Sequence, residues 1–299
     1  MRNAFASAVV AKCNDDRCFF LTGDLGFMAL EEVRSTFGER FVNMGVAEQN
    51  MIGVAAGLAR EGMKVFAYSI APFCYARPYE QIRNDICLNK LPVCLVGNGG
   101  GYAYGHMGPT HHALEDCAAM LALGVQVLIP AFDEDVPALL QAVAQPTYLR
   151  LGYDERPKGS TAPEYAPWRL ILEGNNGVMA ALGPLAGLAW GALSDLSIEA
   201  RPAVWAVTEL PLGKLPEKFL MSIDEQKPLF VIEEHVAAGG LGMQLSYALA
   251  TQGRSGGRFV HRYALGYPSG RFGSQAFHRR QCGLDVVGVR DMVLAESKR

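Results

Sequence analysis

Residues 43–59 have the sequence NMGVAEQNMIGVAAGLA, which is typical of a helix that is apolar on nearly every side. Such a helix is expected to be buried rather than to lie on the surface. It carries one carboxylate near its start, Glu48. A buried carboxylate is either dehydrated, with a raised pKa, or held by a specific partner. The alternative is that Glu48 only complements the helix dipole in the first turn. The helix alone leaves both interpretations open.

Strands and helices alternate on both sides of this helix. Strands are expected at 18–22, 41–43, 64–70, 92–96, 125–129 and 147–151, and helices between them, the first over 2–13. After a polar stretch containing Gly and Pro, strands are again expected at 177–181, 203–207, 229–233 and 259–263. This alternation favours mainly parallel sheets covered on both faces. We therefore expect two three-layer α/β domains, at 1–155 and 169–299, joined by a linker over 156–168.

The composition is that of a globular protein without a basic surface. Half of the 299 residues are hydrophobic, 19% are charged, and the net charge is −3. This charge does not favour a nucleic-acid or membrane-surface partner. The seven cysteines form no CxxC pair, which favours reduced thiols over a disulfide framework or a zinc site. Without a signal-peptide pattern or an apolar run long enough to span a membrane, we expect a cytoplasmic protein.

The longest glycine-rich stretch is GNGGGYAYGHMGPTHH over residues 97–112. Loops of this length in compact domains are usually functional or disordered. Its histidines, at 106, 111 and 112, could supply a proton or a hydrogen bond to an oxyanion. The alternative for 111 and 112 is exposed residues at the start of a helix. Their spacing does not favour a metal site, and the glycines do not form a dinucleotide fingerprint.

Two arginines follow apolar segments, where parallel sheets place ligand contacts. Arg150 ends a predicted strand, and Arg77 lies in a helical segment with Phe73 and Tyr75. Guanidinium groups suit anionic substrates such as phosphates and carboxylates. The alternatives are surface salt bridges for the arginines and ordinary core packing for the aromatic residues.

Four segments in the same order resemble transketolase. They are GVAEQNM at 45–51, RPYEQIR at 77–83, GPTHHALED at 108–116, and EEH followed by GGLG within 233–242. The resemblance is closest to the C-terminal half, as found in split transketolases and related to deoxyxylulose-phosphate synthase. It implies a pyrimidine-binding domain followed by a transketolase C-terminal domain. It also implies transfer of a two-carbon ketol unit from a ketose donor to an aldehyde or ketone acceptor.

The resemblance implies roles toward the cofactor, thiamine diphosphate. Glu48 corresponds to the carboxylate that hydrogen-bonds the aminopyrimidine and activates it. Phe73 corresponds to the aromatic residue that stacks on the pyrimidine ring, and Tyr75 is expected beside it in the cofactor site. A carboxylate in an apolar pocket suits this task better than one in water, because its pKa is raised toward neutrality.

The resemblance implies substrate contacts at three positions, and a fourth is expected at a residue where the sequence departs from the family. His111 corresponds to the active-site histidine of the GPTH motif, which donates a proton or a hydrogen bond to substrate oxygens. Arg77 and Arg150 correspond to contacts with a substrate phosphate, and His106 is expected to take part in recognition. These roles make His111 a catalytic residue together with Glu48.

The family binds the diphosphate and its Mg²⁺ through a GDG motif followed by an asparagine. Residues 23–26 have the sequence GDLG, which lacks the second half of that motif. We therefore expect a partner subunit to anchor both the diphosphate and Mg²⁺, with no metal ligand in this chain. The expected assembly is α2β2, with this chain inactive alone and small sugars or sugar phosphates as substrates.

The substrate motif departs from the usual GEDGPTHQ. His106 and Met107 replace the two acids, Gly99 falls at the position of a phosphate-contacting histidine, and Met28 falls near that of a serine. Donor and acceptor therefore stay open, as does whether they are phosphorylated. Two alternatives also stay open: the β subunit of a 2-oxo-acid dehydrogenase E1 component, and a non-catalytic partner subunit.

Overall fold

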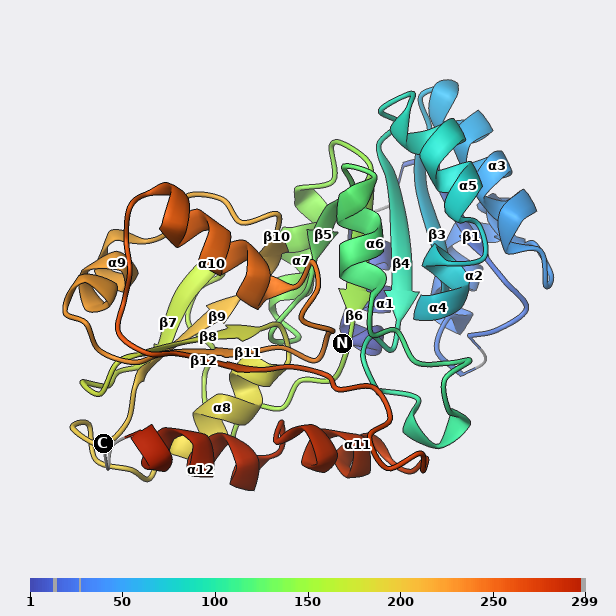
Figure 1. Ribbon diagram of the computed structural model, residues 1–299. Helices are drawn as coiled ribbons and strands as arrows, with labels where there is room; N and C mark the ends of the chain where they lie inside the picture. Colours follow the sequence, from blue (N-terminus) through green and yellow to red (C-terminus); the bar gives the residue numbers. More distant parts are fainter. Residues whose placement is uncertain (13–14, 27, 297–299) are drawn as a thin grey trace.

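The computed structural model describes residues 1–12, 15–26 and 28–296, and two α/β domains lie side by side in it (Figure 1). The first helix, α1 (Arg2–Lys12), matches the helix expected over 2–13, of which residue 13 lies outside the described residues. No helix among the described residues is long and apolar enough to cross a membrane. Five of the six described cysteines are buried, and Cys13 lies outside the described part.

The first sheet has the strand order β10-β5-β6-β4-β3-β1-β2. Its strands from the first half are β1 (Cys18–Thr22), β2 (Phe41–Asn43), β3 (Lys64–Ile70), β4 (Val93–Asn98), β5 (Gln126–Leu128) and β6 (Thr147–Leu151). All of these pair in parallel. The sequence did not predict β10 (Glu209–Leu210), which comes from the second half and pairs with β5 in an antiparallel way. The second half therefore completes the first sheet.

Helices cover both faces of this sheet. The residues of α3 (Glu48–Arg60), α4 (Ala71–Tyr75) and α6 (Asp116–Ala122) pack in one cluster, and those of α1, α2 (Glu31–Phe37) and α7 (Asp135–Gln141) in another. Short helical segments complete the domain: η1 (Gly38–Arg40), α5 (Tyr79–Gln81), the π-helical η2 (Ile82–Cys87) and η3 (Gly105–Met107).

Helix α3 corrects one expectation. It buries Met51, Ile52 and Ala55, but its opposite face leaves Asn50 and Gly53 exposed. The prediction of a helix buried on every side is therefore wrong for this chain. Glycine and polar residues spaced by three or four positions form the exposed face, which the high apolar content of the segment obscured.

The second sheet has the order β12-β11-β8-β9-β7. Its strands are β7 (Trp168–Leu172), β8 (Val178–Leu182), β9 (Ala203–Val207), β11 (Leu229–Ile232) and β12 (Phe259–Arg262). All pair in parallel except β7, which is antiparallel to β9. Helices α8 (Leu185–Leu193), α11 (Gln275–Cys282) and α12 (Val286–Glu296) lie on one side, and α9 (Glu217–Asp224) and α10 (Leu241–Thr251) on the other (Figure 1). The predicted fold class, two α/β domains with mainly parallel sheets, is confirmed.

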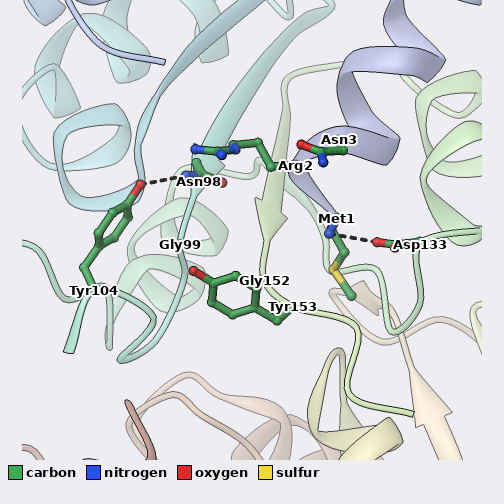
Figure 2. Close-up of a pocket in the computed structure, with 9 residues that line it drawn as sticks. All are labelled: Met1, Arg2, Asn3, Asn98, Gly99, Tyr104, Asp133, Gly152 and Tyr153. Carbon is green, nitrogen blue, oxygen red and sulfur yellow. Dashed lines mark hydrogen bonds and ion pairs between the residues drawn. The ribbon is translucent and has the colours of Figure 1, made fainter. Parts of the chain in front are cut away.

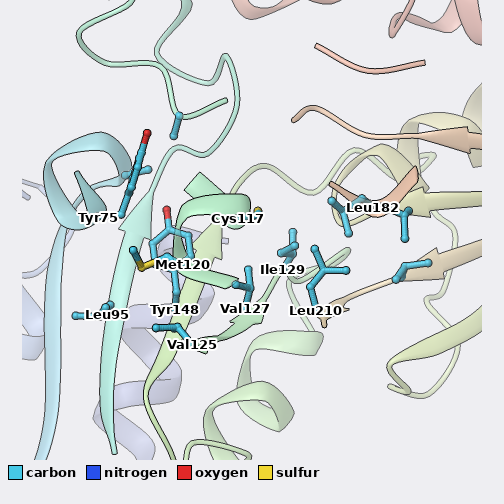
Figure 3. Packing of buried hydrophobic residues seen from close by; sticks show 14 of the residues in the cluster. Tyr75, Leu95, Cys117, Met120, Val125, Val127, Ile129, Tyr148, Leu182 and Leu210 are labelled. Carbon is cyan, nitrogen blue, oxygen red and sulfur yellow. The ribbon is translucent and has the colours of Figure 1, made fainter. Parts of the chain in front are cut away.

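The two domains share buried apolar side chains. Val127 and Ile129 of the first domain belong to the same cluster as Leu182 and Leu210 of the second (Figure 3). Because one continuous cluster joins the sheets, separating the domains would expose apolar surface to water.

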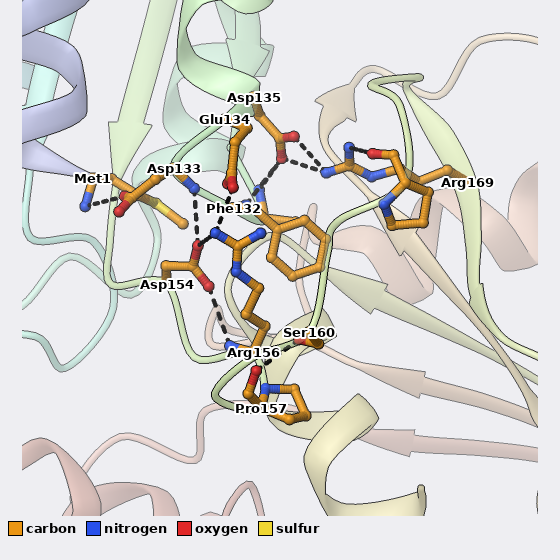
Figure 4. A network of polar contacts seen from close by, with 12 residues as sticks. Met1, Phe132, Asp133, Glu134, Asp135, Asp154, Arg156, Pro157, Ser160 and Arg169 are labelled. Atoms are coloured by element: carbon orange, nitrogen blue, oxygen red, sulfur yellow. Dashed lines mark hydrogen bonds and ion pairs between the residues drawn. The ribbon is translucent and has the colours of Figure 1, made fainter.

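The segment between the domains has no regular structure over 152–167, but hydrogen bonds and ion pairs of charged residues hold it in place (Figure 4). Asp154 accepts hydrogen bonds from the backbone N–H groups of Asp133 (3.0 Å) and Arg156 (3.1 Å). Arg169, at the start of the second sheet, donates to both carboxylate oxygens of Asp135 at 2.5 Å. The predicted linker over 156–168 thus packs against the first domain, and β7 begins at its last residue, Trp168.

Candidate active site

Three predicted site residues lie just beyond the carboxyl ends of parallel strands of the first sheet. Glu48 is the first residue of α3 after β2, Phe73 lies in α4 after β3, and His111 ends the loop that follows β4. The carboxyl ends of parallel strands are where open α/β sheets bind ligands. The fold therefore places all three at an edge suited to a site.

Glu48 and Phe73 share one neighbour, Arg77. The Arg77 Nη1 atom lies 2.7 Å from Glu48 Oε1, and Glu48 is only 6% exposed. The guanidinium carbon of Arg77 also lies 3.6 Å from the centre of the Phe73 ring. The side chain of Gln49 donates to the Arg77 carbonyl oxygen at 3.3 Å. A planar, cationic group is thus stacked on an aromatic ring and bonded to a buried carboxylate.

His111 also contacts Phe73. Its ring centre is 5.1 Å from that of Phe73 and 6.1 Å from that of Tyr104. Its Nδ1 atom shares a hydrogen bond of 2.9 Å with the Thr110 hydroxyl. Glu48, Arg77, Phe73 and His111 therefore form one connected series of contacts. The structure brings these four predicted residues together.

Arg150 lies elsewhere, in a buried network at the junction of the two domains. Its side chain donates to Asp116 Oδ2 at 2.8 Å and to the carbonyl oxygens of Ala113 (2.8 Å) and Glu234 (3.0 Å). Burial opposes the charge of the guanidinium, but Asp116 outweighs this effect, and the pKa of Arg150 is raised. These contacts favour a structural role over the predicted phosphate contact, which stays a prediction.

Tyr75 and His106 are also separate from the series. Tyr75 is buried in the apolar cluster, and its hydroxyl donates to Glu115 Oε1 at 2.8 Å (Figure 3). Burial raises the pKa of this phenol. His106 is exposed in η3, near the middle of the loop. Neither contact pattern supports the predicted cofactor or substrate role, and both roles stay predictions.

A cavity of about 320 Å³ opens at the carboxyl ends of β4 and β6 (Figure 2). Its lining residues are Arg2, Asn98, Tyr104 and Tyr153, together with Met1, Asn3, Gly99, Asp133 and Gly152. The Asn98 amide donates to the Tyr104 hydroxyl at 2.7 Å. Because Tyr104 also faces His111, the cavity adjoins the Glu48–Phe73–His111 series. It offers one guanidinium, two side-chain amides, one carboxylate and two phenol groups to a ligand.

The sequence alone pointed to none of these lining side chains. Arg2 lies in the first helix and Tyr153 after the last strand of the first domain, so no local motif connects them. Asn98 and Tyr104 lie within the glycine-rich loop, which was singled out for its histidines. The signal that was available is that Asn98 and Tyr153 follow strands that the sequence predicts to be parallel.

Gly99 is restricted by its neighbour Tyr104. Its φ angle is +77°, and a Cβ atom there would lie 2.3 Å from the Tyr104 ring. A histidine at this position would need both an unfavourable backbone conformation and a displaced tyrosine. The glycine expected to replace a family histidine thus comes with a tyrosine that fills the space. Met28, at the other replaced position, is 78% exposed.

Comparison with known proteins shows the family to which the sequence is similar. Residues 1–155 match the model of the transketolase pyrimidine-binding domain. The chain is 27% identical over 277 residues to one of the subunits of apulose-4-phosphate transketolase of Actinobacillus succinogenes, covering 87% of this chain and 85% of that protein. It is 30% identical over 278 residues to a putative transketolase C-terminal section of Methanocaldococcus jannaschii, covering 88% and 84%.

One solved structure is similar over nearly its full length. It is described as a split-gene transketolase in an inactive β4 tetramer, and it aligns with a TM-score of 0.81 at 28% identity. The alignment covers 99% of this chain and 97% of that chain. The similarity therefore extends over both domains and the junction between them.

Proposed function

Because this chain belongs to the transketolase family, we propose that it presents Glu48 and Phe73 to a thiamine diphosphate anchored mainly by a partner subunit. The two-component enzyme transfers a two-carbon ketol unit from a ketose donor to an aldehyde or ketone acceptor. The relatives named as a transketolase subunit and as a C-terminal section support a chain that works with an N-terminal partner.

The observation that carries this proposal is the position of Arg77. Its guanidinium is planar, lies 3.6 Å from the Phe73 ring centre, and donates to Glu48 at 2.7 Å. An aminopyrimidine is likewise planar and can both stack on a phenyl ring and share a proton with a carboxylate. The residues present therefore fit the pyrimidine half of the cofactor. Arg77 has to leave the face of Phe73 for that, and its side chain, 42% exposed, is free to move toward solvent.

Thiamine diphosphate, when bound, supplies the electron sink for breaking and forming the carbon–carbon bond. Glu48 contributes a carboxylate that holds or shares a proton at Oε1. Phe73 fixes the orientation of the ring that Glu48 contacts. Because Glu48 is buried at the start of α3, the residues around it keep this carboxylate largely away from water.

His111 supports the part of the site nearer the substrate. Thr110 engages its Nδ1 atom, and among the described residues no hydrogen bond engages Nε2. A ring held at one nitrogen leaves the other to donate to a substrate oxygen. The neighbouring cavity, with Arg2 and Tyr104, is large enough to take the rest of a sugar-sized substrate.

The diphosphate and Mg²⁺ are assigned to the partner, since the 299 residues contain no GDG motif. The exposed side of α3 is where we place the contact with that partner. Val46, just before the helix, and Leu88, after η2, are each 79% exposed. Apolar side chains this exposed are typical of a surface that contacts another protein. An α2β2 assembly would cover them.

The test is reconstitution of this chain with its cognate GDG-containing subunit, followed by product analysis with ketose phosphates and unphosphorylated ketoses. Glu48→Gln is expected to lower kcat by roughly 10²- to 10⁴-fold. The matched control is Glu61→Gln at the exposed end of the same helix. Full activity of Glu48→Gln would remove the proposed role of Glu48. Turnover of a 2-oxo acid instead of a ketose would overturn the transketolase-type reaction.

A further inference from the structure

The loop that carries His111 is closed at its base within the first domain. Gly101 and Ala113 form an antiparallel bridge, with N–H to O distances of 2.9 and 3.0 Å in the two directions. We call residues 101–113 the histidine loop. In Figure 1 it extends from β4 toward the start of α11 in the second domain. Its conformation therefore depends on what it meets there.

Glu234 of the second domain holds the base of the histidine loop. Its Oε1 atom accepts from the Tyr102 backbone N–H at 2.7 Å. The same carboxylate is itself fixed by Arg279, whose Nε donates to Oε2 at 2.6 Å, and by Gln275, whose amide donates at 3.0 Å. Arg279 is buried and also bonds both oxygens of Glu155. A rigid, charged support therefore lies under the first residues of the loop.

The Tyr102 side chain inserts between elements of the second domain. Its ring stacks on His278 of α11, with centres 4.8 Å apart and planes 9° from parallel. Its hydroxyl donates to the Gly266 carbonyl oxygen at 2.8 Å. Tyr102 is fully buried, so this contact orders the loop in a way that an exposed stack would not.

Gly105 and His112 make the contacts nearest to His111. A Cβ atom on Gly105 would lie 2.4 Å from the backbone nitrogen of Gln275, so the loop and the start of α11 touch backbone to backbone. His112, buried, places Nε2 3.1 Å from the Gly105 carbonyl oxygen and Nδ1 2.8 Å from the Tyr267 hydroxyl. Because a carbonyl only accepts, Nε2 carries the proton, and Nδ1 of the neutral ring accepts from Tyr267.

His111 and His112 are adjacent but face different partners. His112 is fixed on the second domain by Tyr267, while His111 meets Phe73 and Tyr104 of the first domain. Fixing one of two neighbouring residues restricts the backbone of the other, since only two dihedral angles per residue are free. A displacement of the loop by an ångström would move the His111 ring away from Phe73.

We propose that the second domain positions His111 for catalysis, with Tyr267 as the positioning residue that acts through His112. This proposal rests on the proposed function, because His111 meets a substrate only in that enzyme. Tyr267 itself touches neither Glu48 nor Phe73. It gives the second domain a role at a site whose proposed catalytic residues, Glu48 and His111, lie in the first domain.

The first test measures amide hydrogen exchange in the isolated full-length chain. Tyr267→Phe removes one hydroxyl and keeps the ring, so the chain is expected to stay folded. Tyr263→Phe is the matched control, since it also removes one tyrosine hydroxyl of the second domain, and the Tyr263 ring packs on His261 with ring centres 4.8 Å apart. We expect amides of the histidine loop to exchange about tenfold faster in Tyr267→Phe. Unchanged exchange relative to Tyr263→Phe would overturn the proposal.

The second test measures steady-state kinetics of the reconstituted complex. Tyr267→Phe is expected to lower kcat by roughly 10- to 100-fold while the Kd for thiamine diphosphate and the KM for the donor change little. Tyr263→Phe should retain the wild-type kcat. If Tyr267→Phe shows faster loop exchange but an unchanged kcat, while His111→Ala is inactive, Tyr267 does not position His111. That result would overturn the positioning role but not the proposed function. If His111→Ala keeps its kcat, the role of His111 in the proposed function fails, and the positioning role fails with it.

Discussion

Arg77 Nη1 lies 2.7 Å from Glu48 Oε1, and the same guanidinium covers the ring of Phe73 at 3.6 Å. The sequence left two interpretations for a buried Glu48, a dehydrated acid or an acid with a specific partner. The structure shows the second in this chain. Arg77 thus occupies the space in which the proposed cofactor ring would lie, between the carboxylate and the aromatic ring.

Loss of this arrangement should weaken the isolated chain only slightly. Arg77→Ala is expected to lower the free energy of unfolding by about 1 kcal/mol, because the Arg77 side chain is 42% exposed and water screens its charge. Urea denaturation measures the change. Arg83→Ala is the matched control, since Arg83 is exposed and donates to the neighbouring Asn84 side chain. Equal stability of the two variants would show that the Arg77 contacts contribute nothing to the fold.

Arg150 should behave as a structural residue. Arg150→Met leaves the buried Asp116 carboxylate without its cation, which is expected to cost about 3–5 kcal/mol of unfolding free energy. Adding Asp116→Asn should recover part of that loss, and urea denaturation of the three variants closes the double-mutant cycle. An Arg150→Met variant of normal stability, with a raised KM for phosphorylated substrates alone, would instead support the predicted phosphate contact.

Gly99 and Tyr104 should be coupled. Gly99→His is expected to destabilise the chain by about 2 kcal/mol or more, because φ is +77° and the new side chain meets the Tyr104 ring. Tyr104→Ala combined with Gly99→His removes the clash but not the backbone strain. The double variant should therefore be more stable than additivity of the single changes allows. Strict additivity in thermal unfolding would contradict the coupling.

The contacts of the histidine loop should weaken in acid. Burial lowers the pKa of His112 and of His278 below the ordinary 6.5, although Glu234 near both acts in the opposite direction. His278 also lowers the pKa of His112, and His106 that of His278. Below about pH 6.5 the unfolded chain therefore binds more protons at these positions than the folded chain does. The free energy of unfolding should therefore decrease as the pH is lowered from about 6.5, until the pH lies below the folded-state pKa values of both histidines.

His112→Asn isolates one of these contributions. Urea denaturation at pH 7 and at pH 5 should give a smaller loss of stability for the variant than for the wild type, whatever its stability at pH 7. The quantity compared is the change in unfolding free energy between pH 7 and pH 5. Carboxylates titrate in both proteins, so their contribution to this change cancels to first order. An identical pH dependence would mean that His112 does not titrate differently on folding.

The sequence predicted the fold well because strands buried on both faces appear as continuous apolar runs. The roles of Glu48, Phe73 and His111 came from the resemblance to transketolase, and the argument from strand ends was made for Arg150, which the structure places in a buried network instead. Contacts between distant segments had no such local signal. Tyr267 and His112 are 155 residues apart in the chain, and Arg150 and Asp116 are 34 apart. Strand β10 was missed because two residues are too few for a periodic pattern, and Arg2 because its helix gives no sign of what its start faces.

In the proposed function, Glu48 activates a cofactor that another chain anchors. The most direct measurement is the rate at which the C2 proton of thiamine diphosphate exchanges with deuterium. It is followed in the cognate subunit alone, in the complex with this chain, and in the complex with Glu48→Gln. We expect rapid exchange only with wild-type chain, and a return toward the rate of the cognate subunit alone with Glu48→Gln. Equally rapid exchange with Glu48→Gln, or tight binding of thiamine diphosphate by this chain alone, would contradict the account.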